Sequence, residues 1–112
     1  MRNRIAFVVF LFTLVSCAAV AAAQRASKPA THTVTIDATS FQPTTLTIKA
    51  GDTVVWVNKD VMPHTATASA AKGFDSGVLL SGKSWKQVFK TKGTQPYVCI
   101  FHPTMKGKLV VK

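Results

Sequence analysis

The chain has 112 residues, enough for one small domain with a modest core and too few for several domains. It carries 14 lysines and arginines against 4 acidic residues, and the formal net charge of +10 favours acidic partners and anionic surfaces. The lysines from Lys28 to Lys112 are spread singly, without a basic cluster, and this spacing argues against a nucleic-acid-binding function.

Residues 1–23 have the pattern of a secretory signal peptide. A basic start precedes an apolar run over residues 5–15, and alanines at residues 21–23 form a small-residue cleavage site. The apolar run is shorter than the roughly 20 residues that a membrane-spanning helix needs. We therefore expect a periplasmic or otherwise exported protein that begins at Gln24. This cleavage removes two arginines and lowers the net charge from +10 to +8.

Residues 14–17, L-V-S-C, also resemble a bacterial lipobox. A lipoprotein with lipidated Cys17 as its first residue therefore stays open as an alternative to the soluble form. With Cys17 in the signal region, Cys99 has no partner for a disulfide within the chain. A lone exported thiol is buried and inert, available to another chain, or bound to a metal, and its neighbours decide among these.

Beyond a flexible leader at residues 24–31, turn residues separate short β-type runs. We expect strands at residues 32–36, 44–49, 53–58, from 84 to a close at Gly93, 97–99 and 108–112, with a tight turn at 50–52 and a possible short strand at 79–80. The two tryptophans, Trp56 and Trp85, lie in these strands and are interpreted as core aromatics. Seven or eight short strands with glycine turns indicate an all-β sandwich or barrel.

Three residues with metal-binding side chains recur at every third position near the C-terminus: Cys99, His102 and Met105. A turn with about three residues per turn would bring the three side chains to one side. Pro103 and Gly107 favour such a bent path over a continuing strand. A loop between two strands could therefore direct a thiolate, an imidazole and a thioether at one point.

A second histidine would complete this site. His64 follows a strand end, in the kind of loop where ligands commonly lie, whereas His32 on the first strand is interpreted as an ordinary surface residue. Two imidazoles, a thiolate and a thioether are the donors of a blue copper site, here one copper per chain. The soft sulphur donors favour Cu(I) and imidazole binds both oxidation states, so the set suits one-electron transfer.

Other chemistries fit these residues less well. Structural zinc seldom uses methionine, and covalent haem attachment needs a second cysteine close to the first. A catalytic role for Cys99 is possible, but nothing else in the chain suggests an enzyme pocket. Taken singly, Cys99 and Met105 are also compatible with ordinary core packing. The combination with the two histidines is what indicates a metal site.

These segments resemble those of the cupredoxin family. Residues 50–58, A-G-D-T-V-V-W-V-N, are similar to the strand before the first histidine ligand of plastocyanin-like members, and V-M-P-H at 61–64 to the ligand segment itself. Residues 99–111, C-I-F-H-P-T-M-K-G-K-L-V-V, resemble the closing segment, with spacers as short as those of amicyanin. The resemblance implies a Greek-key β-sandwich over residues 32–112, with copper held by His64, Cys99, His102 and Met105.

The resemblance also implies a function. The family suggests a monomeric one-electron carrier that is not an enzyme, serving a cytochrome c, an amine dehydrogenase or a copper oxidase or reductase with an acidic docking surface. In the family the second histidine, here His102, reaches the surface within an apolar patch where electrons leave. The candidates for that patch are Met62, Pro63, Phe101 and Pro103. Copper delivery or storage, and an interaction module that works through its basic face, stay open as alternatives.

The chain departs from the family pattern at three places. Thr65 stands where many relatives have an asparagine that helps tie the two ligand loops together. Phe101 replaces the proline that amicyanins have before the second histidine, and residues 95–96 interrupt the usual aromatic alternation before Cys99. None of these changes removes a ligand, but they affect the expected redox potential and partner.

Overall fold

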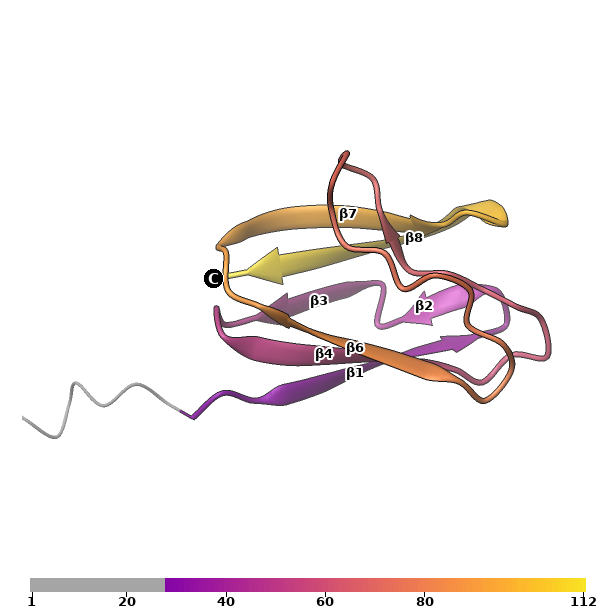
Figure 1. The fold of residues 1–112 in the computed structure, drawn as a ribbon, viewed down its shortest axis with the longest axis horizontal. Helices are drawn as coiled ribbons and strands as arrows, with labels where there is room; N and C mark the ends of the chain where they lie inside the picture. Colours follow the sequence, from indigo (N-terminus) through magenta and orange to yellow (C-terminus); the bar gives the residue numbers. More distant parts are fainter. Residues whose placement is uncertain (1–27) are drawn as a thin grey trace, which may run out of the picture.

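Two four-stranded sheets packed face to face make up residues 28–112, the part of the chain that the computed structural model describes (Figure 1). The expected signal peptide, the lipobox and residues 24–27 of the expected leader lie outside these residues. The strands are β1 Thr31–Asp37, β2 Ser40–Gln42, β3 Thr45–Ile48, β4 Asp52–Asn58, β5 Thr67–Ala68, β6 Ser84–Phe89, β7 Gly93–Cys99 and β8 His102–Val111. The described part contains no helix long and apolar enough to cross a membrane.

One sheet has the strand order β2-β1-β4-β6 and the other the order β3-β8-β7-β5. The chain crosses repeatedly between the two sheets, so β1 lies parallel to β4 and β3 parallel to β8, whereas the remaining neighbours are antiparallel. The expected all-β sandwich is confirmed. Figure 1 shows the turn between β7 and β8 at the end of the sandwich opposite the C-terminus.

The core forms where the inner faces of the two sheets meet. β4 illustrates why these residues form strands, because its burial alternates residue by residue. Val54 and Trp56 are fully buried, and the alternating β-branched residues 53, 55 and 57 are half-buried. Trp56 stacks on Phe74 and lies against the half-buried Trp85, so both tryptophans pack with the core as expected. The hydrophobic core consists of Val34, Ile36, Phe41, Ile48, Val54, Trp56, Ala66, Phe74, Leu79, Phe89, Tyr97, Cys99, Met105, Leu109 and Val111.

The last strand corrects the expected bent path after Cys99. β8 begins at His102 and continues to Val111, well before the expected start of the final strand at residue 108. The pairing with β7 nevertheless shifts between Val98 and Cys99, so that residues 103–105 face no residue of β7. This irregularity accommodates Pro103, which has no N–H to donate to a partner strand.

Three smaller differences concern strand ends. Gly93 opens β7 instead of closing β6, and β7 passes through Pro96 to Cys99, longer than expected. β2 and β5 were not expected, because runs of three and two residues carry no detectable alternation. Leu79 forms only an isolated bridge, with His64, and no strand.

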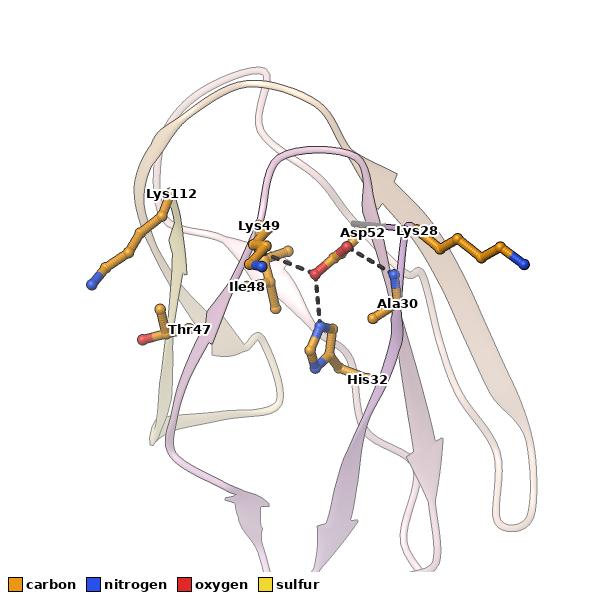
Figure 2. A pocket seen from close by; sticks show the side chains of 8 residues that line it. All are labelled: Lys28, Ala30, His32, Thr47, Ile48, Lys49, Asp52 and Lys112. Atoms are coloured by element: carbon orange, nitrogen blue, oxygen red, sulfur yellow. Dashed lines mark hydrogen bonds and ion pairs between the residues drawn. The ribbon is translucent and has the colours of Figure 1, made fainter. Parts of the chain in front are cut away.

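At the end opposite the β7–β8 turn, Asp52 joins the start of β1 to the turn between β3 and β4 (Figure 2). Its carboxylate accepts hydrogen bonds from Ala30 N (2.9 Å), Lys49 N (3.0 Å) and His32 Nε2 (2.9 Å). His32 is therefore half-buried and bonded, and not the ordinary surface residue that we expected. The bond from Ala30 N contributes most to lowering the pKa of Asp52, and together with the bonds from His32 and Lys49 it brings this pKa to about 2.

Candidate metal centre

The β7–β8 turn brings two of the expected ligands together. Cys99 is the last residue of β7 and His102 the first of β8, and the two are paired across the turn formed by Ile100 and Phe101. The third comes from the segment between β4 and β5, where the backbone of His64 is held by hydrogen bonds in both directions with Leu79. The spacing of three therefore acts across a tight hairpin, and not through the three-residue turn that we expected.

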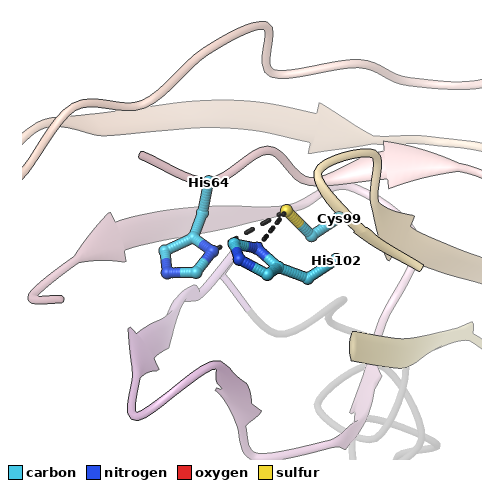
Figure 3. A group of neighbouring side chains, drawn as sticks. All are labelled: His64, Cys99 and His102. Atoms are coloured by element: carbon cyan, nitrogen blue, oxygen red, sulfur yellow. Dashed lines mark hydrogen bonds between the residues drawn. The ribbon is translucent and has the colours of Figure 1, made fainter. Parts of the chain in front are cut away.

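The donor atoms of these three residues converge (Figure 3). Cys99 Sγ lies 3.7 Å from His64 Nδ1 and 3.7 Å from His102 Nδ1, and all three atoms lie within 4.8 Å of one another. Cys99 and His64 are completely buried, whereas His102 is half-buried. Among residues 28–112 this is the one group of three or more histidine, cysteine or acidic side chains with such geometry.

The separations suit a shared metal ion. First-row metals bind imidazole nitrogen at about 2.0 Å and thiolate sulphur at about 2.3 Å, which places sulphur and nitrogen about 3.5–3.8 Å apart in tetrahedral or trigonal sites. The two sulphur–nitrogen distances of 3.7 Å lie in this range. The donors fit copper by their chemistry, since thiolate suits Cu(I) and imidazole suits both oxidation states.

Met105, the fourth expected ligand, lies on β8 and is 4% exposed. It belongs to the same buried cluster as Cys99. β8 thus carries both a half-buried imidazole at its start and a buried thioether three residues later.

An aspartate orients the buried imidazole. His64 Nε2 donates a hydrogen bond to Asp60 Oδ2 at 2.9 Å, which leaves the Nδ1 lone pair facing Cys99. Asp60 is itself held by Thr39 N, from the turn between β1 and β2, and by Val61 N. The bond from His64 is the main cause that lowers the pKa of Asp60. For His64, burial lowers the pKa, but the bonds to Asp60 and Cys99 outweigh it and the net shift is upward.

The surroundings of Cys99 favour the thiolate form of its side chain. Burial raises its pKa, but the hydrogen bond from Thr65 N and the contacts with His102 and His64 outweigh this effect. The pKa falls to about 6, so the thiolate is accessible near neutral pH even without a metal.

Sequence reasoning missed the residues that hold the ligand segments in place. Asn58 Nδ2 donates to both Met62 O and Leu79 O at 2.8 Å, while its Oδ1 accepts a bond from Asp60 N. Thr65 retains the tying role expected of asparagine, because its Oγ1 accepts a hydrogen bond from Ile100 N at 3.0 Å. An acidic residue four positions before the ligand histidine was the one available signal for Asp60.

Apolar side chains are exposed on the three segments around His102. Asn58 brings the Met62 and Leu79 segments together, and Thr65 joins them to the β7–β8 turn. We call the exposed residues of these segments the apolar rim: Val61, Met62, Val78, Leu80, Ile100 and Phe101, each between 46% and 87% exposed. Two of the expected patch residues, Met62 and Phe101, belong to it, and the other two, Pro63 and Pro103, are also exposed.

A family model described as a cupredoxin-like domain matches residues 4–111. The chain belongs to this family. The solved structure of a purple cupredoxin from Nitrosopumilus maritimus superposes on this cupredoxin with a TM-score of 0.68 and 29% identity, over 72% of this chain and 99% of the other. An amicyanin variant in the Cu(I) form gives a TM-score of 0.70 and 29% identity, over 73% and 82%.

Among the similar sequences, amicyanin-alpha from Methylorubrum extorquens is 37% identical over 76 residues, which cover 64% of each chain. The aligned regions cover between 54% and 64% of the length of this amicyanin and two further amicyanins. The cupredoxin thus shares its domain with them, and not their full length.

Proposed function

We propose that this cupredoxin is a type 1 copper protein that carries single electrons between redox partners and is not itself an enzyme. The observation that carries the proposal is the convergence of Cys99 Sγ and one ring nitrogen from each of two histidines within 4.8 Å. Support also comes from the amicyanin relatives and from the similar solved structure of an amicyanin variant in the Cu(I) form. Copper would supply the one-electron couple when bound.

The four ligands in this proposal are His64, Cys99, His102 and Met105. Cys99 contributes the anionic sulphur, whose pKa of about 6 favours metal binding at neutral pH. His64 is the interior imidazole, held by Asp60. His102 is the imidazole on the solvent side, and the buried thioether of Met105 is the weak fourth donor.

We infer that redox partners dock on the apolar rim, where His102 comes closest to the surface. Large exposed apolar side chains on three adjoining segments are typical of a protein interaction site. Residues 28–112 contain eleven lysines, all exposed, against four aspartates. Since Asp52 and Asp60 are bonded within the fold, the surface favours a partner with an acidic docking face, such as a cytochrome c, an amine dehydrogenase or a copper oxidase or reductase.

The first test is titration of the purified protein with Cu(II), followed by visible absorption and EPR. We expect an intense thiolate-to-copper band at one equivalent, with narrow copper hyperfine splitting. Cys99→Ala should abolish the band, and His32→Ala serves as a matched control outside the cluster. A weak band with wide splitting would mean that copper is bound without a strong bond to Cys99, and would contradict the assignment.

A second test separates electron transfer from copper delivery or storage. An electron carrier should exchange electrons rapidly with a soluble cytochrome c in stopped-flow experiments and keep its copper against a chelator. Rapid loss of copper with slow electron exchange would favour delivery or storage instead.

We also propose that the protein works outside the cytoplasm, after cleavage following Ala23 or as a lipoprotein that begins at Cys17. Intact-mass measurement of the protein from the producing cell distinguishes the two forms. An unprocessed N-terminus would contradict both.

A further inference from the structure

A chain of hydroxyl groups runs from the ligand loop to an exposed carboxylate on a different segment. Ile100 N donates to Thr65 Oγ1 (3.0 Å), which contacts Thr67 Oγ1 (2.9 Å), and Thr67 Oγ1 donates to Asp75 Oδ1 (3.0 Å). Ile100 follows Cys99 directly and, with Phe101, forms the turn that leads to His102. Asp75 itself contacts none of the expected ligands.

The carboxylate determines the direction of every bond in this chain. An ionised carboxylate can only accept, so the single proton of the Thr67 hydroxyl is donated to Asp75. Thr67 Oγ1 must then accept the proton of Thr65, whose own oxygen remains available to Ile100 N. The completely buried Thr65 hydroxyl therefore has one arrangement in which it is fully bonded.

The segment that carries Asp75 is held by bonds that do not involve its side chain. Thr67 and Asp75 form an antiparallel bridge, and Ala68 N donates to Phe74 O at 2.8 Å. On the other side, Ser76 N donates to Ala66 O at 3.0 Å. Apart from these backbone bonds, the carboxylate accepts one bond outside the hydroxyl chain, from Gly77 N at 2.9 Å. The backbone position of Asp75 thus does not depend on the hydroxyl chain.

We propose that Asp75 is a positioning residue for the metal centre, which holds the Cys99–His102 turn in place through the hydroxyls of Thr67 and Thr65. This inference rests on the proposed copper site. Loss of the Thr67 hydroxyl removes the acceptor of the Thr65 proton, and loss of the carboxylate removes the acceptor that fixes the direction of the Thr67 hydroxyl. Either change weakens the bond from Ile100 N to Thr65. The turn that carries two ligands then gains mobility, although no ligand has been changed.

Amide hydrogen exchange in the metal-free protein tests the hydrogen-bonded chain of hydroxyl groups independently of copper binding. Thr67→Val and Asp75→Ala should each speed exchange at the Ile100 amide about 5- to 10-fold, which corresponds to the loss of roughly one hydrogen bond. Exchange at Val54 in the central strand β4 should not change. Thr67→Ser, which keeps the hydroxyl, should restore the slow rate at Ile100, and Thr94→Val is the matched control on an exposed threonine of β7.

The copper-loaded protein provides a second measurement. Thr67→Val and Asp75→Ala should shift the thiolate-to-copper band and the copper hyperfine splitting, whereas Thr67→Ser and Thr94→Val should not. Unchanged exchange at Ile100 in both variants, or equal acceleration at Ile100 and Val54, would overturn the proposal. If the unaltered protein lacks the thiolate-to-copper band, the proposed function fails, and the exchange rates still decide whether Asp75 positions the turn.

Discussion

The two ends of the sandwich each hold a histidine paired with an aspartate. His64 Nε2 lies 2.9 Å from Asp60 Oδ2, and His32 Nε2 lies 2.9 Å from Asp52 Oδ2. The pairs differ on the other side of the imidazole ring. His64 is completely buried with its Nδ1 directed at Cys99, whereas the side chain of His32 is 28% exposed and belongs to no group of metal-binding side chains within residues 28–112.

A histidine–carboxylate contact is therefore not by itself a sign of a metal site. At one end the Asp60 carboxylate fixes the His64 ring. This ring faces the Cys99 thiol and lies near the His102 imidazole, both of which come from the β7–β8 turn. At the other end Asp52 accepts backbone N–H groups from two segments, and His32 completes its set of hydrogen bonds. The His32–Asp52 pair therefore contributes to the closure of the fold.

The largest difference should appear when each histidine is removed. His64→Ala takes away a donor and should abolish the intense thiolate-to-copper band at one equivalent of Cu(II). His32→Ala should retain the band at full intensity and lower the melting temperature, because Asp52 loses one of its bonds. Visible absorption and thermal unfolding measure both effects, and a normal band in His64→Ala would contradict the assigned site.

Removal of each aspartate should give the next largest effect. Asp60→Ala frees the His64 ring to reorient, and loss of such a supporting group typically weakens metal binding about 10- to 100-fold. Asp52→Ala should leave copper affinity unchanged and reduce thermal stability. Competition with a chelator of known affinity measures the binding. Equal affinity in the two variants would remove the proposed role of Asp60.

The middle of the sandwich can be altered without touching either end. Gly107 is buried on β8 opposite Tyr97, and a Cβ at this position would collide with the tyrosine ring. Gly107→Ala should therefore destabilise the fold by about 1–3 kcal/mol, as is usual for overpacking. Urea unfolding measures the loss, and the copper spectrum should stay unchanged. A spectral change would mean that packing in the middle of β8 controls the centre.

The smallest effect concerns acid stability. The pKa of Asp52 is lowered to about 2 in the folded protein, so its contribution to stability is complete above about pH 4 and is lost as the pH falls toward 2. Asp52→Asn lacks this dependence. The difference in stability between the unaltered protein and Asp52→Asn should therefore shrink between pH 4 and pH 2, as measured by urea unfolding. A constant difference over this interval would contradict the shifted pKa.

Much of the fold could be predicted from local patterns, but strand ends could not. The β-branched and aromatic run T-V-V-W-V-N at residues 53–58 predicted β4, because such side chains favour strands. β2 and β5 are too short for such a pattern, and the start of β8 at His102 was obscured by Pro103. The proline is tolerated only because the pairing with β7 is interrupted there. That interruption depends on the partner strand.

By itself, the sequence determined the all-β class and the candidate donor side chains, because strand patterns and the spacing from Cys99 to Met105 are local properties. Only the tertiary structure decided which distant groups meet. His64, between β4 and β5, reaches Cys99 at the end of β7, Asp75 reaches the β7–β8 turn through Thr67, and His32 is held by Asp52. These contacts depend on how the strands pair and how the two sheets pack, which no local pattern along the chain specifies.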